Sequence, residues 1–309
     1  MTGGGAFFQR RMARRGLLWC PAGGAGPLEE IHRQSLLDYG LALMIALGSE
    51  DVTVAVPPPA RAQAAEAVRA GRDLGVAVHV VEADPGLGPA LRAAAPRLGG
   101  CPLLLAPLGL FLHLARGEDI ARQDVRQRGA TLFASGASGS LSSPRITADA
   151  LGVVREVLAG PRDGAEAPAL AGLGLHLLDA RAMDFAGWLE PGLSEAAAEA
   201  ALLRLYASER SLRLGTLPAG AAWHRLGGGD APAAARRFVA QRREAGDGLF
   251  GLPEAASFER GLIDVRTMQE ARHLHAGTPL GEAVERRLNQ GAPEPADPGA
   301  FSSRALSSG

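Results

Sequence analysis

The chain has 309 residues, of which 47% are hydrophobic and 21% charged, and its formal net charge is −1 at pH 7, so it is long enough for one large α/β domain or two small ones. This charge balance excludes a protein built for electrostatic attraction to nucleic acid or to an anionic membrane, and no apolar run reaches the ~20 residues of a membrane-spanning helix. Cys20 and Cys101 fit no metal-ligand or disulfide pattern, so we expect two buried, free thiols in a cytoplasmic protein.

Apolar runs alternate with helical segments through the first half of the chain. Four of these runs are short, bounded by glycine or proline, and predict strands at residues 16–20, 52–56, 76–81 and 102–106. Helices are predicted at residues 29–47, 60–74 and 88–98. The alternation is typical of a three-layer α/β/α, Rossmann-like fold with a mixed, mostly parallel sheet. Ligands bind at the carboxyl ends of strands in such sheets, so one cleft should be lined by the loops at residues 21–27, 82–88 and 107–109.

The second half continues the pattern and ends in a helical region. Strands are predicted at residues 130–135, 152–157, 171–178 and 212–217. Helices are predicted at residues 194–206, 233–246, 253–261 and 265–288. We divide the chain into a flexible extension (1–15), an α/β domain (16–250), a C-terminal helical region of the same domain (251–289) and a disordered tail rich in Pro, Gly and Ser (290–309).

A glycine-rich loop follows the first predicted strand. Gly23, Gly24 and Gly26 would let backbone N–H groups approach a phosphate. Glycine clusters at strand ends are more often simple turns, so this motif by itself does not decide between the two.

Several motifs, each weak alone, follow one another in a specific order. Residues 16–26 read G-L-L-W-C-P-A-G-G-A-G, residues 82–88 read E-A-D-P-G-L-G, residues 103–108 read L-L-L-A-P-L, residues 171–179 read A-G-L-G-L-H-L-L-D, and residues 222–228 read A-W-H-R-L-G-G. In this order they resemble the G-I-I-L-A-G-G-x-G-T-R-L, Q-x-x-P-x-G-L, L-V-L-G-D-N, T-G-L-Y-F-Y-D and A-W-L-D-T-G-T motifs of the glucose-1-phosphate thymidylyltransferases, a family of sugar-1-phosphate nucleotidyltransferases. The resemblance extends over residues 16–288, and the shared order carries it.

The resemblance implies a nucleotide site and an oligomer. Gly23, Gly24, Gly26, Glu82 and Gly88 would form the nucleotide site, the last two in the base-recognition loop. The ligands implied are a nucleotide, a nucleotide sugar or a sugar phosphate. The family's homotetramers, usually dimers of dimers, imply a homo-oligomer here. Neither a nucleic acid nor a membrane is expected as a partner.

The residues that the family uses for catalysis are replaced in this chain. Pro107 and Arg225 stand at the two aspartates that hold Mg²⁺ in the family, and neither side chain binds a cation. Arg33 stands at the lysine of the K-Q motif, and the chain contains no lysine at all. The sugar-phosphate motif E-K-P reads A-G-P at residues 159–161. Since both metal ligands are replaced, we expect no Mg²⁺ site. Each lost metal or cationic contact to phosphate costs on the order of 10²- to 10³-fold in rate, so we also expect no useful turnover.

Arg33 and Arg225 are the candidate catalytic or phosphate-binding residues that remain. The guanidinium of Arg225 would replace the metal by forking onto phosphate oxygens, with Arg33 facing it from the other side. The alternative is that Arg225 points to solvent or pairs with an acidic side chain. Glu82 stands where the family has a glutamine, and an ionised carboxylate only accepts hydrogen bonds, so base selection should also be altered.

Two classes of function follow from these replacements. The first is a non-catalytic, nucleotidyltransferase-like pseudoenzyme that binds a ligand or partner in a sugar or natural-product biosynthetic pathway. The second is an enzyme whose active site is the cleft that the family uses. It would be either a nucleotidyltransferase in which Asp38 or Asp84 takes over as metal ligand, or an enzyme with a new metal-free reaction. An enzyme requires convergent polar groups in the cleft, whereas an interaction protein should have a cleft filled by Trp19, Pro107 and Leu108.

Other polar residues are expected to have structural roles. His113 lies in an apolar stretch and should be a buried histidine with a partner. His273 and His275 are two positions apart on a predicted helix, so they do not share a face as a metal pair would. Residues 135–139 read S-G-A-S-G, which is a loop rather than a nucleophile elbow.

Overall fold

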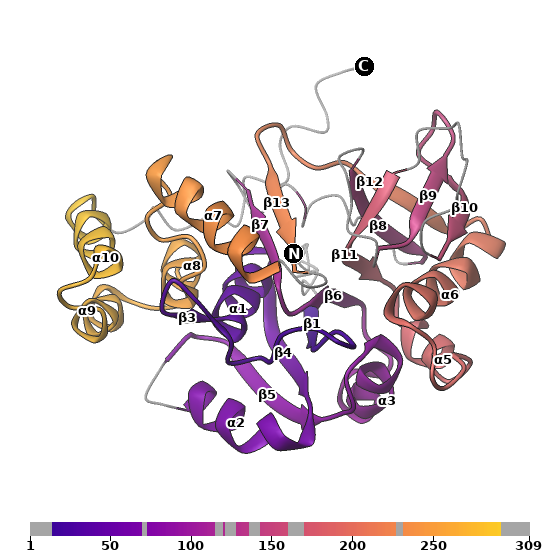
Figure 1. Cartoon of the computed structure of the whole chain (residues 1–309), viewed down its shortest axis with the longest axis horizontal. Coiled ribbons are helices and arrows are strands. Elements are labelled where there is room, and N and C mark those ends of the chain that lie inside the picture. The colour runs from indigo at the N-terminus through magenta and orange to yellow at the C-terminus, as the bar shows by residue number, and fades with distance from the viewer. Residues whose placement is uncertain are drawn as a thin grey trace, which may run out of the picture.

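A mixed β-sheet forms the centre of the computed structural model, which describes residues 14–69, 73–114, 120, 128–135, 143–159, 170–226 and 231–291 (Figure 1). Its parallel part has the order β6-β1-β4-β5 and consists of β1 (Arg14–Trp19), β4 (Ser49–Val56), β5 (Ala77–Glu82) and β6 (Leu103–Pro107). β11 (Leu170–Leu178) pairs antiparallel with β6 and extends the sheet to the strands of the second half, which are β8 (Ala130–Ser135), β9 (Arg145–Ala148), β10 (Val154–Leu158) and β12 (Leu212–Gly215).

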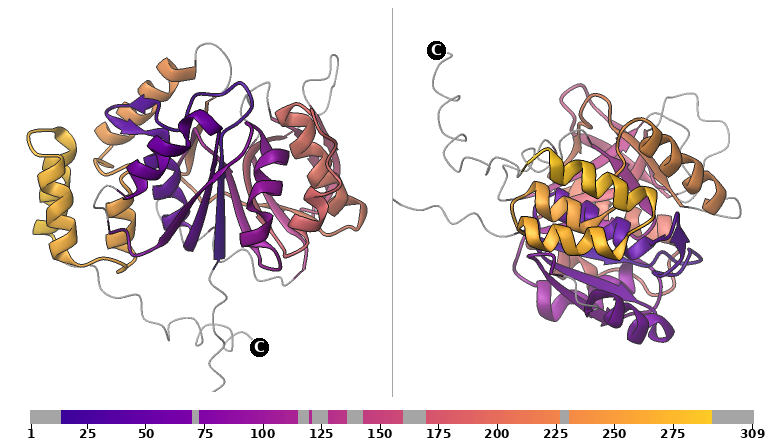
Figure 2. Two further views of the ribbon diagram at one scale, coloured as in Figure 1. Left: turned by 90° about the horizontal axis from the view of Figure 1, so that it is seen from below. Right: turned by 90° about the vertical axis from the view of Figure 1, so that its left-hand side faces the viewer.

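Alternate residues of the central strands enter two hydrophobic cores, one on each face of the sheet. Leu18 of β1 packs with α1 (Leu36–Ala46) and α2 (Arg61–Arg69) on one face. Leu17 and Trp19 pack with α3 (Leu87–Leu98), α5 (Ala182–Ala186) and α6 (Glu195–Ser208) on the other face. The two helical layers enclose the sheet (Figure 2). The predicted three-layer α/β/α class with a mixed sheet and a parallel core is therefore confirmed.

The C-terminal helices cover one edge of this arrangement. They are α7 (Ala231–Glu244), α8 (Pro253–Glu259), α9 (Val265–Leu274) and α10 (Pro279–Asn289). α8 packs against α1, and the α9–α10 pair lies outside α8 (Figure 2). The prediction of one helix over residues 265–288 is wrong, because Gly277 adopts a φ of 71° and Thr278 caps a new helix whose first residue is Pro279.

The prediction of a helix over residues 29–47 is also wrong at its start. Residues 29–35 contain a small hairpin of β2 (Glu30–Ile31) and β3 (Gln34–Ser35) instead. His32 and Arg33 form its turn with φ angles of 50° and 65°, a left-handed conformation for which the sequence shows no Gly or Asn signal. Ser35 and Asp38 then form a reciprocal capping box that starts the helix at Leu36.

A second small sheet, which the sequence did not predict, brings distant segments together. β7 (Leu110–His113) pairs antiparallel with β13 (Ala222–Arg225), and Arg225 is the register partner of Leu110. Leu226 then donates its N–H to the carbonyl of Gly109. The end of β6 is thereby held beside the end of β13, which determines the geometry of the site described below.

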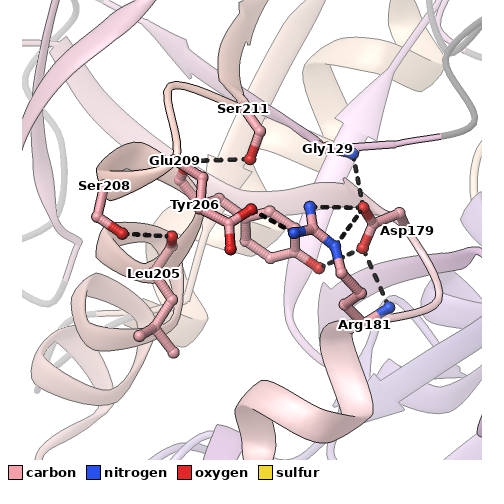
Figure 3. A network of polar contacts seen from close by, with 8 residues as sticks. All are labelled: Gly129, Asp179, Arg181, Leu205, Tyr206, Ser208, Glu209 and Ser211. Atoms are coloured by element: carbon pink, nitrogen blue, oxygen red, sulfur yellow. Dashed lines mark hydrogen bonds and ion pairs between the residues drawn. The ribbon is translucent and has the colours of Figure 1, made fainter.

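Asp179 anchors the opposite end of the sheet, where Leu178 of β11 pairs with Leu103 at the start of β6. Its carboxylate accepts hydrogen bonds from the Tyr206 hydroxyl (3.0 Å), the Gly129 N–H (2.6 Å) and the backbone and guanidinium of Arg181 (Figure 3). Burial raises the pKa of Asp179, but these donors outweigh burial and hold the pKa below its ordinary value. Asp179, which ends the segment resembling T-G-L-Y-F-Y-D, therefore has a structural role.

Candidate functional site

The three loops expected to line the cleft converge at the carboxyl ends of the parallel strands. The N–H of Gly86, in the loop at residues 82–88, donates to the carbonyl of Cys20 at 2.8 Å. The N–H of Leu108, in the loop at residues 107–109, donates to the carbonyl of Trp19 at 2.7 Å. The sequence therefore placed these loops correctly, and β1 joins them.

The glycine loop forms a tight turn at the surface. Gly24 donates its N–H to the carbonyl of Pro21 at 3.1 Å, and Gly23 adopts a φ of 69°, which favours glycine. Gly23, Gly24 and Gly26 are exposed. The N–H of Ala22 points inward and meets the carboxylate oxygen Oε2 of Glu195 at 3.4 Å.

Pro107 and Arg225, the two positions that resemble the family's metal aspartates, lie side by side. A Cβ atom built on Gly174 would lie 3.0 Å from Arg225 Nη1 and 3.0 Å from Pro107 Cδ. Gly174 has a φ of 84°, so β11 approaches both side chains where only glycine fits without strain. The proximity of these positions agrees with the order of motifs in the sequence, because residues 118 positions apart meet at one point.

Arg225 is buried and paired with an acidic side chain. Its Nη1 lies 3.4 Å from Glu199 Oε2 and 3.4 Å from Ser143 Oγ, and Arg225 is 6% exposed. Glu199 and His176 are 0% exposed, and His176 Nε2 lies 2.9 Å from Glu199 Oε1. Because an ionised carboxylate only accepts, His176 donates from Nε2. The expected alternative for Arg225, pairing with an acidic side chain, is the arrangement found.

Two carboxylates one helical turn apart on α6 have opposite pKa shifts. Burial raises the pKa of Glu199, but the charge of Arg225 and the hydrogen bond from His176 outweigh burial and hold the pKa below its ordinary value. Burial also raises the pKa of Glu195. The Trp19 indole N–H donates to Oε1 at 2.6 Å and offsets only part of this rise, so the pKa stays above its ordinary value. Glu199 is thus held ionised by a cation, whereas Glu195 has neutral donors.

The remaining predicted residues are Arg33, Glu82 and Gly88, of which the first two are exposed. Arg33 lies at the tip of the β2–β3 hairpin, whereas Arg225 is buried, and the placement of these two cations on either side of a ligand stays a prediction. Glu82 is exposed at the end of β5, and Gly88 is buried in the first turn of α3. Of the sugar-phosphate segment at residues 159–161, the last two lie outside the described residues, as do residues 1–13, 136–139, 227–230 and 292–309.

Of the two aspartates considered as shifted metal ligands, one caps a helix and the other lies in a loop of the expected cleft. Asp38 accepts hydrogen bonds from the N–H and hydroxyl of Ser35 in the capping box of α1. Asp84 is exposed in the loop before α3. Within the described residues, no cluster of three or more His, Cys, Asp or Glu side chains is arranged to hold a metal ion. None of the helices that the structure describes combines the length and hydrophobicity needed to cross a membrane.

The other histidines are placed as the sequence suggested. His113 Nδ1 lies 2.8 Å from Asp247 Oδ2, so this partly buried histidine has its expected partner. His273 is exposed at the end of α9. Cys20 and Cys101 are free thiols, the first of them buried, and burial raises its pKa to about 12. None of these groups lies in the Glu195–Glu199–Arg225 cluster.

Glu195, Glu199 and His176 were missed as site residues. The helix at residues 194–206 was predicted, and the spacing of four between the two glutamates places them on one helix face. A signal was available, because a histidine inside an apolar strand and two glutamates inside an alanine-rich helix are polar groups at core positions. Their contact with Trp19 and Arg225 is tertiary and has no local signature.

Buried apolar side chains lie at the ends of β1 and β6, where the sequence predicts a cleft. Trp19 is 0% exposed, Leu108 is 2% exposed and Pro107 is buried. These are the three side chains expected to fill the cleft of an interaction protein. The carboxylates of Glu195 and Glu199 are hydrogen-bonded to neighbouring groups, whereas the buried Nδ1 of His176 has no hydrogen-bond partner among the described residues.

Comparison with known proteins establishes the fold. No family model and no curated protein sequence matches this chain. A solved structure described as a glucose-1-phosphate thymidylyltransferase from Bacillus anthracis, in complex with a sucrose, is similar at a TM-score of 0.63 and 11% identity, covering 73% of this chain and 94% of that one. A UDP-glucose pyrophosphorylase is similar in its apo form (TM-score 0.62) and with UDP-glucose (0.60), each at 14% identity and covering 75% of this chain and 100% of the other.

Proposed function

We propose that this chain is a nucleotidyltransferase-like protein that acts by binding a ligand or partner in a sugar or natural-product pathway, without nucleotidyl transfer. The observation that carries the proposal is the buried Arg225–Glu199 ion pair, which lies beside Pro107 where the resembling family has its metal aspartates. The similarity to structures of a glucose-1-phosphate thymidylyltransferase and a UDP-glucose pyrophosphorylase supports the choice of sugar-nucleotide chemistry as the origin of the cleft.

Electrostatics explains why this arrangement opposes the reaction. Nucleotidyl transfer requires positive charge at the triphosphate, which metal ions and cationic side chains supply. The positive charge of Arg225 is neutralised by Glu199 at 3.4 Å and further offset by Glu195. A metal-free reaction at the same place is less favoured, because Glu195 is hydrogen-bonded to Trp19 and Ala22, and Glu199 to Arg225 and His176. The homo-oligomer, a dimer or tetramer, stays a prediction of the resemblance.

The first test is a coupled pyrophosphate-release assay on the purified chain with Mg²⁺, glucose-1-phosphate and either dTTP or UTP. We expect release no faster than in the blank without protein. A parallel reaction with EDTA in place of Mg²⁺ separates metal-dependent turnover from contamination by other phosphate-releasing activities. Metal-dependent release well above the blank would refute the proposal.

A further inference from the structure

The carboxylate of Glu195 lies against the backbone of the glycine loop. Its Oε2 lies 3.4 Å from the N–H nitrogen of Ala22, and a Cβ atom built on Gly86 would lie 3.7 Å from the same oxygen. The carboxylate is therefore held between the glycine loop and the turn before α3. Glu195 is 7% exposed, so it is a fixed part of the cleft floor rather than a mobile surface side chain.

The hydrogen bonds of this carboxylate come from neutral groups. Within the described residues, its two donors are the Trp19 indole N–H, at 2.6 Å, and the Ala22 N–H. The hydrogen bonds of the nearby cation Arg225 are made with Glu199 and Ser143. Within the part of the chain that the structure describes, no ion pair to Glu195 is formed. When both glutamates are ionised, their two negative charges exceed the single positive charge of Arg225. The group of Glu195, Glu199 and Arg225 then has a net negative charge.

We propose that the Glu195 carboxylate occupies the anion position of the glycine loop and is the residue that makes the cleft reject phosphate groups. The ligand class that fits is then one without phosphate at this loop, which offers hydroxyl or ammonium donors to the carboxylate. The inference rests on the proposed function, since it names the ligand chemistry of the same cleft.

The physical basis is repulsion at short range in a partly desolvated site. A phosphate bound to the glycine loop would bring its oxygens next to Glu195, since both seek the Ala22 N–H. A unit charge about 4 Å from a carboxylate lowers the affinity by about 1000-fold when the effective dielectric constant is near 20. Removing this one charge should therefore restore anion binding at the loop, although it restores no catalytic group.

Calorimetric titration with inorganic pyrophosphate tests the inference on three proteins. The wild type should show no saturable binding. Glu195→Gln should gain saturable binding, with a dissociation constant at least about tenfold below the highest pyrophosphate concentration at which the wild type shows none, because its amide retains an acceptor for Trp19 and supplies an N–H donor at the loop. Glu190→Gln is the matched control, since it removes the same charge from an exposed side chain five residues earlier. It should behave as the wild type does.

Each other outcome overturns the inference. Pyrophosphate binding by the wild type with a submillimolar Kd would overturn the inference. This result needs no variant, so it holds even if Glu195→Gln fails to fold. A folded Glu195→Gln that gains no binding, or an equal gain in Glu190→Gln, does so as well. Failure of the proposed function is a separate result: a wild type that turns over nucleotide refutes both, whereas one that binds pyrophosphate without turnover refutes only the role of Glu195.

Discussion

Replacing Arg225 by alanine should destabilise the protein by about 3–5 kcal/mol, because it leaves a buried carboxylate without its cation. Glu199 is 0% exposed and accepts hydrogen bonds only from Arg225 and His176 within the described residues. Urea unfolding at neutral pH measures the loss as a fall in midpoint at constant m-value. Arg237→Ala, which truncates an exposed arginine on α7, should change stability by no more than about 0.5 kcal/mol.

The penalty for Arg225→Ala should shrink in acid. The pKa of Glu199 in the folded protein lies below its ordinary value of 4.5, so its ionised form contributes stability above that value. This contribution is lost as the pH falls through the folded pKa. The unfolding free energies of wild type and Arg225→Ala should therefore converge as the pH falls below about 4.5. A gap that stays constant over this range means that Arg225 stabilises the fold by packing rather than by its charge.

Gly174→Ala should destabilise the protein by about 2–4 kcal/mol, by forcing a left-handed residue into contact with two side chains. The added Cβ would meet the Pro107 ring and Arg225 Nη1, each at 3.0 Å. These contacts are tighter than ordinary van der Waals contact, so β11, the Pro107 ring or Arg225 must shift by a few tenths of an ångström. Thermal unfolding should show a clear loss relative to the wild type.

Gly192→Ala is the matched control for the glycine substitution. Gly192 has a similar φ of 79°, but a Cβ atom there meets nothing within 4 Å. This variant therefore carries the backbone strain, about 1–2 kcal/mol, without the contact. If the two variants are equally destabilised, the close approach of β11 to Pro107 and Arg225 is not a constraint on the fold.

The sequence predicted most of the strands and helices, because apolar runs bounded by Gly and Pro are local signals. It also placed the three cleft loops together, since parallel strands end at a common edge. The hairpin at residues 29–35 was missed because His32 and Arg33 adopt left-handed angles without the usual residues. The break between α9 and α10 has local signals, because Gly277 ends the first helix, Thr278 caps the second and Pro279 begins it.

The chemistry of the site was harder to predict than its position. Pro107 and Arg225 were singled out by the resemblance, and the structure places them in contact with the same glycine. The partners of Arg225 depend on α6, whose glutamates reach residues 26 and 176 positions away in the sequence. No periodicity or spacing encodes which side chain meets such a partner, so Glu195 and Glu199 emerged only from the three-dimensional arrangement.

The most direct measurement is calorimetric titration of the wild-type protein with dTTP, in the presence and absence of Mg²⁺. If the Arg225–Glu199 pair and Pro107 have replaced the metal site, Mg²⁺ should produce no increase in the affinity for dTTP. If Glu195 also occupies the anion position, neither titration should show saturable heat. Saturable dTTP binding that tightens by tenfold or more when Mg²⁺ is added would contradict this assignment of the cleft.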